Sequence, residues 1–121
     1  MGNPHAIVFD VACTEAELDE LGPRLSKSLA GGTNVEFVRA TGPAAFEVLV
    51  WERGVGRTLA CGTGAAAVAA LAAITGRAPY DEAITLRLPG GPLSLTVRRE
   101  DLAVTLRGPA RFVFSGEVPE P

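Results

Sequence analysis

The chain has 121 residues, of which 47% are hydrophobic and 21% charged, and its formal net charge is -3. These values are typical of one globular domain and exclude a disordered or fibrous chain. The basic residues are scattered, which argues against nucleic acid or a membrane surface as a partner. The longest apolar run, residues 65–74, is too short to cross a bilayer. We therefore expect a cytoplasmic protein with two free thiols.

The first 30 residues predict a strand followed by a helix. Residues 5–11 are apolar and rich in β-branched side chains, as in a largely buried strand that pairs on both edges. Thr14 and Glu17 have the spacing of a capping box, which marks a helix start. Leucines then recur at helical intervals over residues 15–29, where Pro23 favours a break. We expect a surface helix in one or two pieces.

The middle of the chain predicts a hairpin and a second helix. Residues 34–39 and 46–53 alternate apolar and polar side chains on either side of a turn-prone segment, which favours two antiparallel strands. The alanine-rich stretch from 62 to 74 has no polar face and is followed by Gly76 in the position of a C′ residue. A helix that is apolar all round must be enclosed all round, so we expect it at the centre of the domain.

The remaining segments predict an antiparallel meander of short strands separated by turn residues. These strands are expected at residues 83–88, 93–98, 102–107 and 111–114. The predicted fold class is α+β: a curved, mostly antiparallel sheet of about seven or eight strands wrapped around one buried central helix. No linker or repeat divides residues 1–121, so we expect a single domain.

One segment combines residue types that suit catalysis. Residues 51–65 run from a strand end through a glycine-rich turn into the second helix, with Cys61 at the helix start. Unpaired N–H groups and the helix dipole at that position predict a lowered pKa for the thiol. The amides of Gly62 and Thr63 and the Thr63 hydroxyl can approach a carboxylate. A bound amino acid would then place its Cα beside the sulfur, and a thiolate can remove the Cα proton without metal or cofactor.

Taken singly, these residues leave structural alternatives open. A buried cysteine is more often an inert small hydrophobe than a catalyst. Glu52 and Arg53 can equally form a solvated ion pair, and His5 can be a hydrogen-bonded core residue. Cys13 lies just before the expected helix cap, and its neighbours suggest no activation, so it is interpreted as an incidental thiol.

Several passages taken together resemble the C-terminal half of diaminopimelate epimerases. The segment with the most specific match is ERGVG at 52–56 followed by TLACGTGA at 58–65. Further passages match in order: MGNPH at 1–5, TNVEF at 33–37, LPGG at 88–91 and GPARFVF at 108–114. The resemblance implies a two-domain enzyme whose pseudo-symmetric halves each wrap strands around a central helix, with the active site in the cleft between them. Residues 1–121 would be the C-terminal half.

The resemblance also implies an activity. Similar enzymes are cofactor-independent isomerases that convert LL-diaminopimelate to the meso form in lysine biosynthesis. One thiolate removes the Cα proton while a second thiol, from the other half, protonates the opposite face. By this match the catalytic group would consist of Cys61, Glu52 and His5. The substrate would be held by Gly62 and Thr63 at its reacting carboxylate and by Asn3, Asn34 and Arg53 at its distal end. No metal is implied.

The chain departs from the family pattern in two respects. Arg57 stands where the family usually has an acidic residue, and it would favour the thiolate if its side chain pointed inward. The N-terminal half and its thiol are missing, so the chain carries one of the two groups that inversion needs.

Four hypotheses about the whole remain open at this point. The chain can be a half that folds but is inactive alone, or a homodimer that brings two Cys61 thiols across a shared cleft. It can also be a non-catalytic module that binds amino-acid carboxylates or serves as the folding partner of a separate N-terminal chain. Finally, the CGTG sequence is similar to the cysteine loop of proline racemase-like enzymes, although the other matched passages fit diaminopimelate epimerases better.

Overall fold

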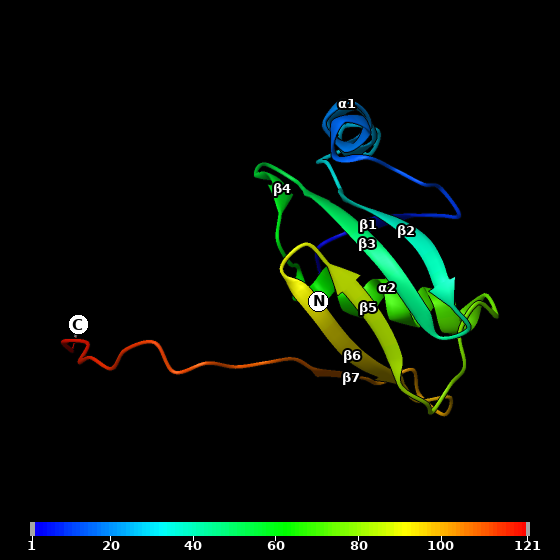
Figure 1. The fold of residues 1–121 in the computed structure, drawn as a ribbon. Coiled ribbons are helices and arrows are strands. Elements are labelled where there is room, and N and C mark those ends of the chain that lie inside the picture. The colour runs from blue at the N-terminus through cyan, green and yellow to red at the C-terminus, as the bar shows by residue number, and fades with distance from the viewer. Residues whose placement is uncertain (1, 121) are drawn as a thin grey trace.

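A computed structural model describes residues 2–120, and its ribbon is drawn in Figure 1. It contains seven strands and two helices. Their bounds in chain order are β1 His5–Phe9, α1 Glu15–Ser26, β2 Asn34–Gly42, β3 Ala45–Glu52, β4 Gly56–Thr58, α2 Gly62–Ile74, β5 Ile84–Leu88, β6 Gly91–Val97 and β7 Val104–Arg107. Met1, the first residue of one matched passage, lies outside the described residues, as does Pro121.

All seven strands belong to one mixed sheet. The strand order is β1-β2-β3-β5-β6-β7, and β4 pairs with β3 beside this path. Four pairings are antiparallel, whereas β1–β2 and β3–β5 are parallel. The predicted strand number and the predominance of antiparallel pairing are therefore confirmed. Among the described residues β1 pairs only with β2, so the expected pairing on both of its edges is wrong, and all of its residues are only half-buried.

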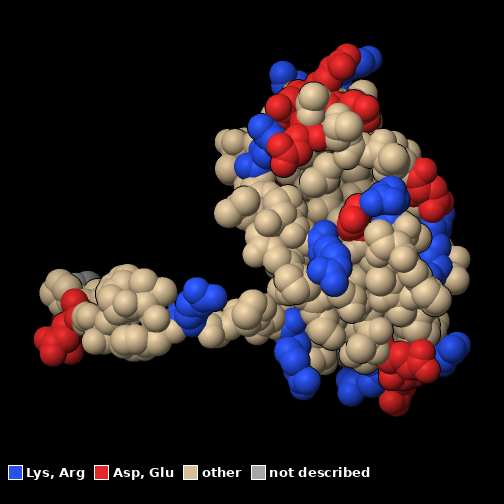
Figure 2. Space-filling model, in the orientation of Figure 1, with Lys and Arg blue, Asp and Glu red and all other residues tan. Residues whose placement is uncertain are grey.

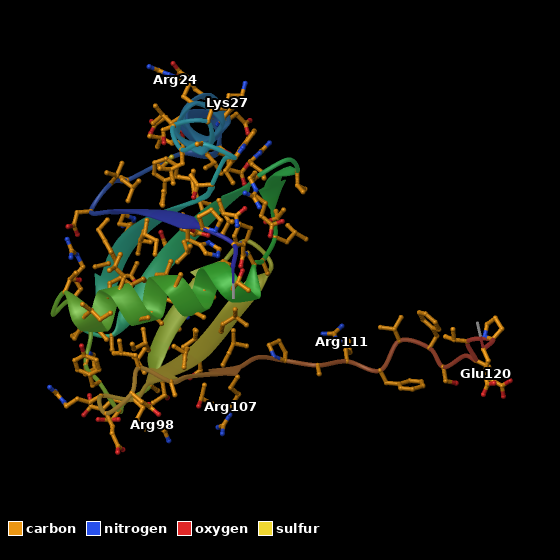
Figure 3. All side chains as sticks on the ribbon, turned by 180° about the vertical axis from the view of Figure 1, so that it is seen from behind. Arg24, Lys27, Arg98, Arg107, Arg111 and Glu120 are labelled. Atoms are coloured by element: carbon orange, nitrogen blue, oxygen red, sulfur yellow. The ribbon has the colours of Figure 1, made fainter. Side chains whose placement is uncertain are left out.

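Helix α2 lies across one face of the sheet, as seen from behind in Figure 3. It is rich in alanine, which has the highest helix propensity and lets the helix axis approach the strands closely. It ends at Ile74, with Thr75 as C-cap and Gly76 at a positive φ of 77° in the C′ position, as predicted. Its buried side packs on the main core together with Phe46, Val48 and Leu86.

The enclosure of α2 is less complete than the sequence predicts. The residues buried against the sheet are Gly64, Ala65, Val68, Ala69, Ala72 and Ala73. The residues of the opposite side are half-buried, and Ile74 is 52% exposed. Within the described residues, α2 is therefore buried against the sheet on one side and only half-buried on the other, and its enclosure on every side stays a prediction.

Helix α1 packs on the other face of the sheet. Leu18, Gly22 and Ser26, four residues apart, form its buried stripe, and Leu18 contacts a small cluster with Val35 and Phe37. At Gly22 the helix touches the indole of Trp51, because a Cβ there would lie 2.6 Å from Trp51 Cδ2. The helix runs through Pro23 without a break, so the predicted interruption is wrong. Tertiary packing against β2 and β3 keeps the helix continuous although proline cannot donate a hydrogen bond.

The C-terminal segment leaves the body of the molecule. Residues 108–120 are described with neither helix nor strand and extend away from the sheet in Figures 1 and 2. The strand predicted at residues 111–114 is therefore wrong. Phe112 and Phe114 are 84% and 81% exposed, since no neighbouring strand within the described residues pairs with this segment.

Two strand ends are set by backbone conformations that the side-chain pattern did not reveal. Asp10 and Leu102 have positive φ values of 63° and 60°, a conformation that interrupts an extended strand. For this reason β1 stops at Phe9 and β7 starts only at Val104. Between residues 2 and 120, none of the helices has the length and apolar character needed to cross a membrane.

Candidate active site

The thiol of Cys61 forms the cap of helix α2. Cys61 has an extended backbone with φ of -142°, and its Sγ accepts the N–H of Gly64 at 3.4 Å. The residue is buried, with 8% of its surface exposed. Gly62 and Thr63 occupy the first two helical positions, where a helix leaves N–H groups without partners. None of the residues of this first turn is acidic, and the N–H groups at its positive end can bind an anionic ligand.

Asn3, His5 and Thr63 join the cysteine in one hydrogen-bonded group. Asn3 Nδ2 donates to Thr63 Oγ1 at 2.9 Å and lies 3.3 Å from His5 Nε2. Thr63 Oγ1 lies 3.5 Å from Cys61 Sγ. These residues come from the segment before β1, from β1 itself and from α2. The parallel β1–β2 pair thus carries the chain's N-terminal segment to the start of α2, and the structure brings together four of the predicted site residues.

The protonation state of Cys61 differs from the sequence-based prediction. Burial raises the pKa of the thiol, and this effect is larger than the lowering by hydrogen bonds from Thr63 and Gly64. The carboxyl group of Glu52 raises this pKa further, which also indicates that Glu52 lies beside the thiol. The expected lowering of the pKa is therefore wrong, because desolvation outweighs the helix start.

Asn34 and Arg53 interact with each other rather than with the cysteine. Asn34 Oδ1 accepts the backbone N–H of Arg53 at 2.8 Å. Arg53 Nη1 donates to the carbonyl oxygen of Gly31 at 2.9 Å and to that of Gly32 at 3.3 Å. These contacts fix the turn that leads into β2 against the end of β3. The guanidinium group is exposed and lies outside the hydrogen-bonded group around Cys61.

Arg57 points toward helix α1 and away from the start of α2. Its Nη1 lies 2.8 Å from a carboxylate oxygen of Glu15, and its Nε lies 2.9 Å from one of Asp19. The condition under which Arg57 would favour the thiolate, an inward-pointing side chain, is therefore not met, and the acidic side chains of α1 neutralise this charge on the surface.

A pocket of about 390 Å³ opens beside this group of residues. Its lining consists of Asn3, His5, Thr63, Ala66, Ala67 and Val104. A larger hollow of about 470 Å³ lies on the α1 face, where Cys13, Arg39 and Arg87 contribute to its lining. It contains none of the predicted site residues, so we place the candidate site at the start of α2.

The family model for diaminopimelate epimerase matches residues 1–113. The chain belongs to the diaminopimelate epimerase family. Among curated relatives named diaminopimelate epimerase, that of Heliobacterium modesticaldum is 42% identical over 121 residues, which are 98% of this chain. The protein of Carboxydothermus hydrogenoformans is 45% identical over 120 residues, or 97% of this chain. The chain spans 42% of the length of either relative.

Solved structures show that the fold is shared more widely than the sequence. A predicted epimerase from Pseudomonas aeruginosa superposes with a TM-score of 0.65 at 19% identity, covering 85% of this chain and 35% of that chain. A phenazine biosynthesis protein of the PhzF family from Bacillus anthracis gives a TM-score of 0.66, also at 19% identity, covering 88% and 34%. At this level of identity, both superpositions show similarity of the fold alone.

One residue of this diaminopimelate epimerase-family site, Glu36, was not singled out from the sequence, nor was its contact with Gly64. Glu36 is completely buried on β2, and its Oε1 lies 2.7 Å from His5 Nδ1. Gly64 lies where the Glu36 carboxyl group meets the first turn of α2. A signal for Glu36 was present, because it is a charged residue flanked by the apolar residues Val35 and Phe37 in the first, buried part of the strand.

Proposed function

We propose that this chain is the C-terminal half of a two-domain, cofactor-independent amino-acid epimerase that converts LL-diaminopimelate to the meso form. The observation that carries the proposal is the position of Cys61, whose thiol caps α2 beside the N–H groups of Gly62 and Thr63 in the first helical turn. Thr63 contacts this thiol, and Asn3, His5 and Thr63 line a pocket beside it. Membership of the diaminopimelate epimerase family and the names of the relatives support this substrate.

In this proposal the start of α2 binds the substrate's reacting carboxylate. The N–H groups of Gly62 and Thr63 point toward an anion, and the open space beside Gly62 accommodates it. Such donors also stabilise the negative charge that develops on the carboxylate when the Cα proton leaves. The substrate Cα then lies next to Cys61 Sγ, within reach of a proton transfer.

Inversion in this scheme needs one thiolate and one thiol on opposite faces of the substrate Cα. The thiolate removes the proton, and the thiol delivers another to the opposite face, so that each sulfur ends in the state in which the other began. Because burial and Glu52 raise the pKa of Cys61, this sulfur is poised as the proton donor in one direction. In the reverse direction Cys61 is already the thiolate left by that donation, and it acts as the base that removes the Cα proton.

The distal end of the substrate is assigned to Asn3, Asn34 and Arg53. Asn3 lines the pocket, and Asn34 holds the backbone of Arg53. The guanidinium of Arg53 is exposed on a turn, so it can exchange its carbonyl partners for a substrate carboxylate, which arginine binds in a bidentate manner.

We also propose that the second thiol comes from an N-terminal half that covers the remaining side of α2. This arrangement would complete the enclosure of the central helix, since the uncovered side of α2 is apolar and carries Ile74. A second copy of this chain is the alternative source of the thiol, favoured by the exposed apolar side chains of Phe112 and Phe114. Sedimentation over a range of concentrations separates the two arrangements.

The test is incubation of the chain with LL-diaminopimelate in deuterated water, with and without a separately expressed N-terminal half. Cα deuteration and meso product are followed by NMR. Product that forms only with both halves, and is lost in Cys61→Ser, supports the two-domain enzyme. Product formed by this chain alone supports the homodimer, and a lack of product in both mixtures overturns the proposed function.

A further inference from the structure

A buried carboxyl group lies directly behind the histidine of the candidate site. The Glu36 side chain projects from β2 to the α2 face and is 0% exposed. Its Oε1 lies 2.7 Å from His5 Nδ1, and its Oε2 has no hydrogen-bond partner among the described residues. Removing a carboxyl group from water is costly, and a core position in a strand is ordinarily apolar. We therefore attribute the burial of Glu36 to its contact with His5.

The hydrogen bonds around His5 determine which ring nitrogen carries the proton. Asn3 Nδ2 has two hydrogens: one is donated to Thr63 Oγ1, and the other faces His5 Nε2. Nε2 must then accept with its lone pair. A neutral imidazole accepts at one nitrogen and donates at the other, so Nδ1 holds the proton and donates it to Glu36 Oε1.

Gly64 provides the space that the Glu36 carboxyl group occupies. A Cβ at Gly64 would collide with Glu36 Oε1 and lie 3.2 Å from its Cδ and 3.3 Å from Cys61 Sγ. A Cβ at Gly62, two residues earlier, would meet no atom within 4 Å. The two glycines that flank Thr63 thus differ in what they do. The first leaves room for an external ligand, and the second leaves room for Glu36.

We propose that Glu36 is a positioning residue that holds His5 in its Nδ1–H form, and that Gly64 is required because this carboxyl group lies against the first turn of α2. The Nε2 lone pair of His5 is then directed toward Asn3 and the pocket, where it can take part in proton exchange. Carboxyl groups fix histidine tautomers in this way at many catalytic sites. The inference depends on the proposed function only in assigning His5 a role beside the thiol.

The tautomer can be measured directly because His5 is the single histidine of the chain. Long-range proton–nitrogen NMR correlations distinguish a protonated from an unprotonated ring nitrogen. We expect a protonated Nδ1 in the wild-type chain and in Glu36→Gln, whose side-chain oxygen can still accept. Glu36→Leu, which has no acceptor, should shift the population toward the Nε2–H form. A Glu36→Leu chain that keeps the Nδ1–H form overturns the inference.

Gly64→Ala tests the same arrangement without altering the carboxyl group. We expect it to displace Glu36 and weaken the Nδ1–H form, whereas Gly62→Ala, the matched control for this NMR readout, should leave the tautomer unchanged. Gly64→Ala and Glu36→Leu should act through the same contact. The double variant that carries both substitutions should therefore show a tautomer shift no larger than that of Glu36→Leu alone. Equal tautomers in Gly64→Ala and in the wild type would contradict the role of Gly64. This variant also decides the matter if Glu36→Leu does not fold.

Turnover by the enzyme assembled from both halves gives the functional readout. At metal sites, loss of a residue that orients a histidine ligand typically lowers metal affinity or activity by about 10- to 100-fold, and we take this range as the scale for His5. We expect Glu36→Leu to lower kcat by this factor with little change in KM, and Glu36→Gln to restore most of it. An unchanged kcat in Glu36→Leu overturns the positioning role. Because the NMR experiment needs no substrate, a failure of the proposed epimerase function would leave the tautomer result standing and would be recognised separately.

Discussion

The two helices of this protein both begin next to a cysteine, yet the two helix starts are built differently. Cys13 precedes the cap of α1, and Thr14 supplies the capping oxygen, which accepts the N–H of Glu17 at 3.2 Å. At α2 the cysteine is itself the cap: Cys61 Sγ accepts the N–H of Gly64. Burial raises the pKa of both thiols. Proximity to a helix start therefore does not by itself produce a reactive cysteine.

The difference lies in what surrounds each helix start. The first turn of α1 contains Glu15 and Glu17, whose negative charges already complement the helix dipole. None of the residues in the first turn of α2 is acidic, and glycine occupies two of its first three positions. The residues of α1 themselves supply the negative charges at its start, whereas the start of α2 can bind an external anion. This contrast, rather than thiol acidity, distinguishes the candidate site.

The largest expected effect comes from replacing each of the two cysteines separately with alanine. In the enzyme assembled with its N-terminal half, Cys61→Ala should lower kcat by roughly 10²- to 10⁴-fold, the range expected for a lost acid/base group. Cys13→Ala should leave kcat unchanged, because its thiol lies near the start of α1, outside the group around Cys61. Meso product formation measured by NMR checks both, and equal losses in the two variants would abolish the contrast.

A negative charge placed in the first turn of α2 should imitate α1. Gly62→Asp satisfies the helix dipole from within the chain and repels a substrate carboxylate, a juxtaposition that costs several kcal/mol. We expect KM to rise by roughly tenfold or more, since about 1.4 kcal/mol corresponds to a factor of ten. Substrate titration provides the measurement, with Gly62→Asn as the neutral control. If Gly62→Asp binds the substrate as tightly as the wild type, the substrate carboxylate does not bind at the start of α2.

Removing the α1 cap should affect stability but not catalysis. Thr14→Ala removes the side-chain oxygen that accepts the Glu17 N–H, and loss of such a cap costs about 1 kcal/mol. Urea unfolding should report this decrease in the free energy of unfolding, while kcat stays at the wild-type value. Thr41→Ala, at an exposed position of β2, is the control and should change stability by less than about 0.5 kcal/mol.

A smaller effect is expected at Arg57, which links β4 to the acidic start of α1. Its pairs with Glu15 and Asp19 are exposed, so Arg57→Ala should cost about 0.2–1 kcal/mol in urea unfolding, and less at high salt. Alkylation of Cys61 should follow the same pH profile in Arg57→Ala as in the wild type. A shifted profile would mean that Arg57 acts on the thiol after all.

The smallest expected effect concerns the acidic neighbour of each thiol. Glu52→Gln removes a group that raises the pKa of Cys61, and Glu17→Gln removes one that raises the pKa of Cys13. Burial is the larger cause at both sites, so each pKa should fall only part of the way toward its ordinary value. Thiolate would then form at a lower pH. The alkylation rate against pH, measured in chains that retain one cysteine, tests the two changes separately.

Local patterns predicted most of the elements correctly because their signals are short-range. Thr14 and Glu17 marked the start of α1, and Gly76 marked the end of α2, since both rest on hydrogen bonds within a few residues. The hairpin of β2 and β3 followed from alternation around one turn. In contrast, the parallel pairings β1–β2 and β3–β5 join segments far apart in the chain, and no local pattern specifies them.

The candidate site shows the same division. Cys61, Gly62 and Thr63 were recognised from their position at a helix start, which is a local property. The chain of contacts from Glu36 through His5 to Asn3 depends on β1 lying beside β2, and only the structure gives it. The pKa of Cys61 was predicted in the wrong direction because burial depends on the strands packed around the helix, whereas the helix start is visible in the sequence.

The single tryptophan and the single histidine of the chain lie on different faces of the sheet. Trp51 packs against Gly22 of α1, while His5 bonds to Glu36 on the α2 face. Indole fluorescence during denaturation should therefore follow the undocking of α1, and the imidazole resonances should follow the opening of the other layer. Each side of the molecule thus has a built-in spectroscopic probe, and a comparison of the two transitions will reveal whether its layers melt together or in sequence.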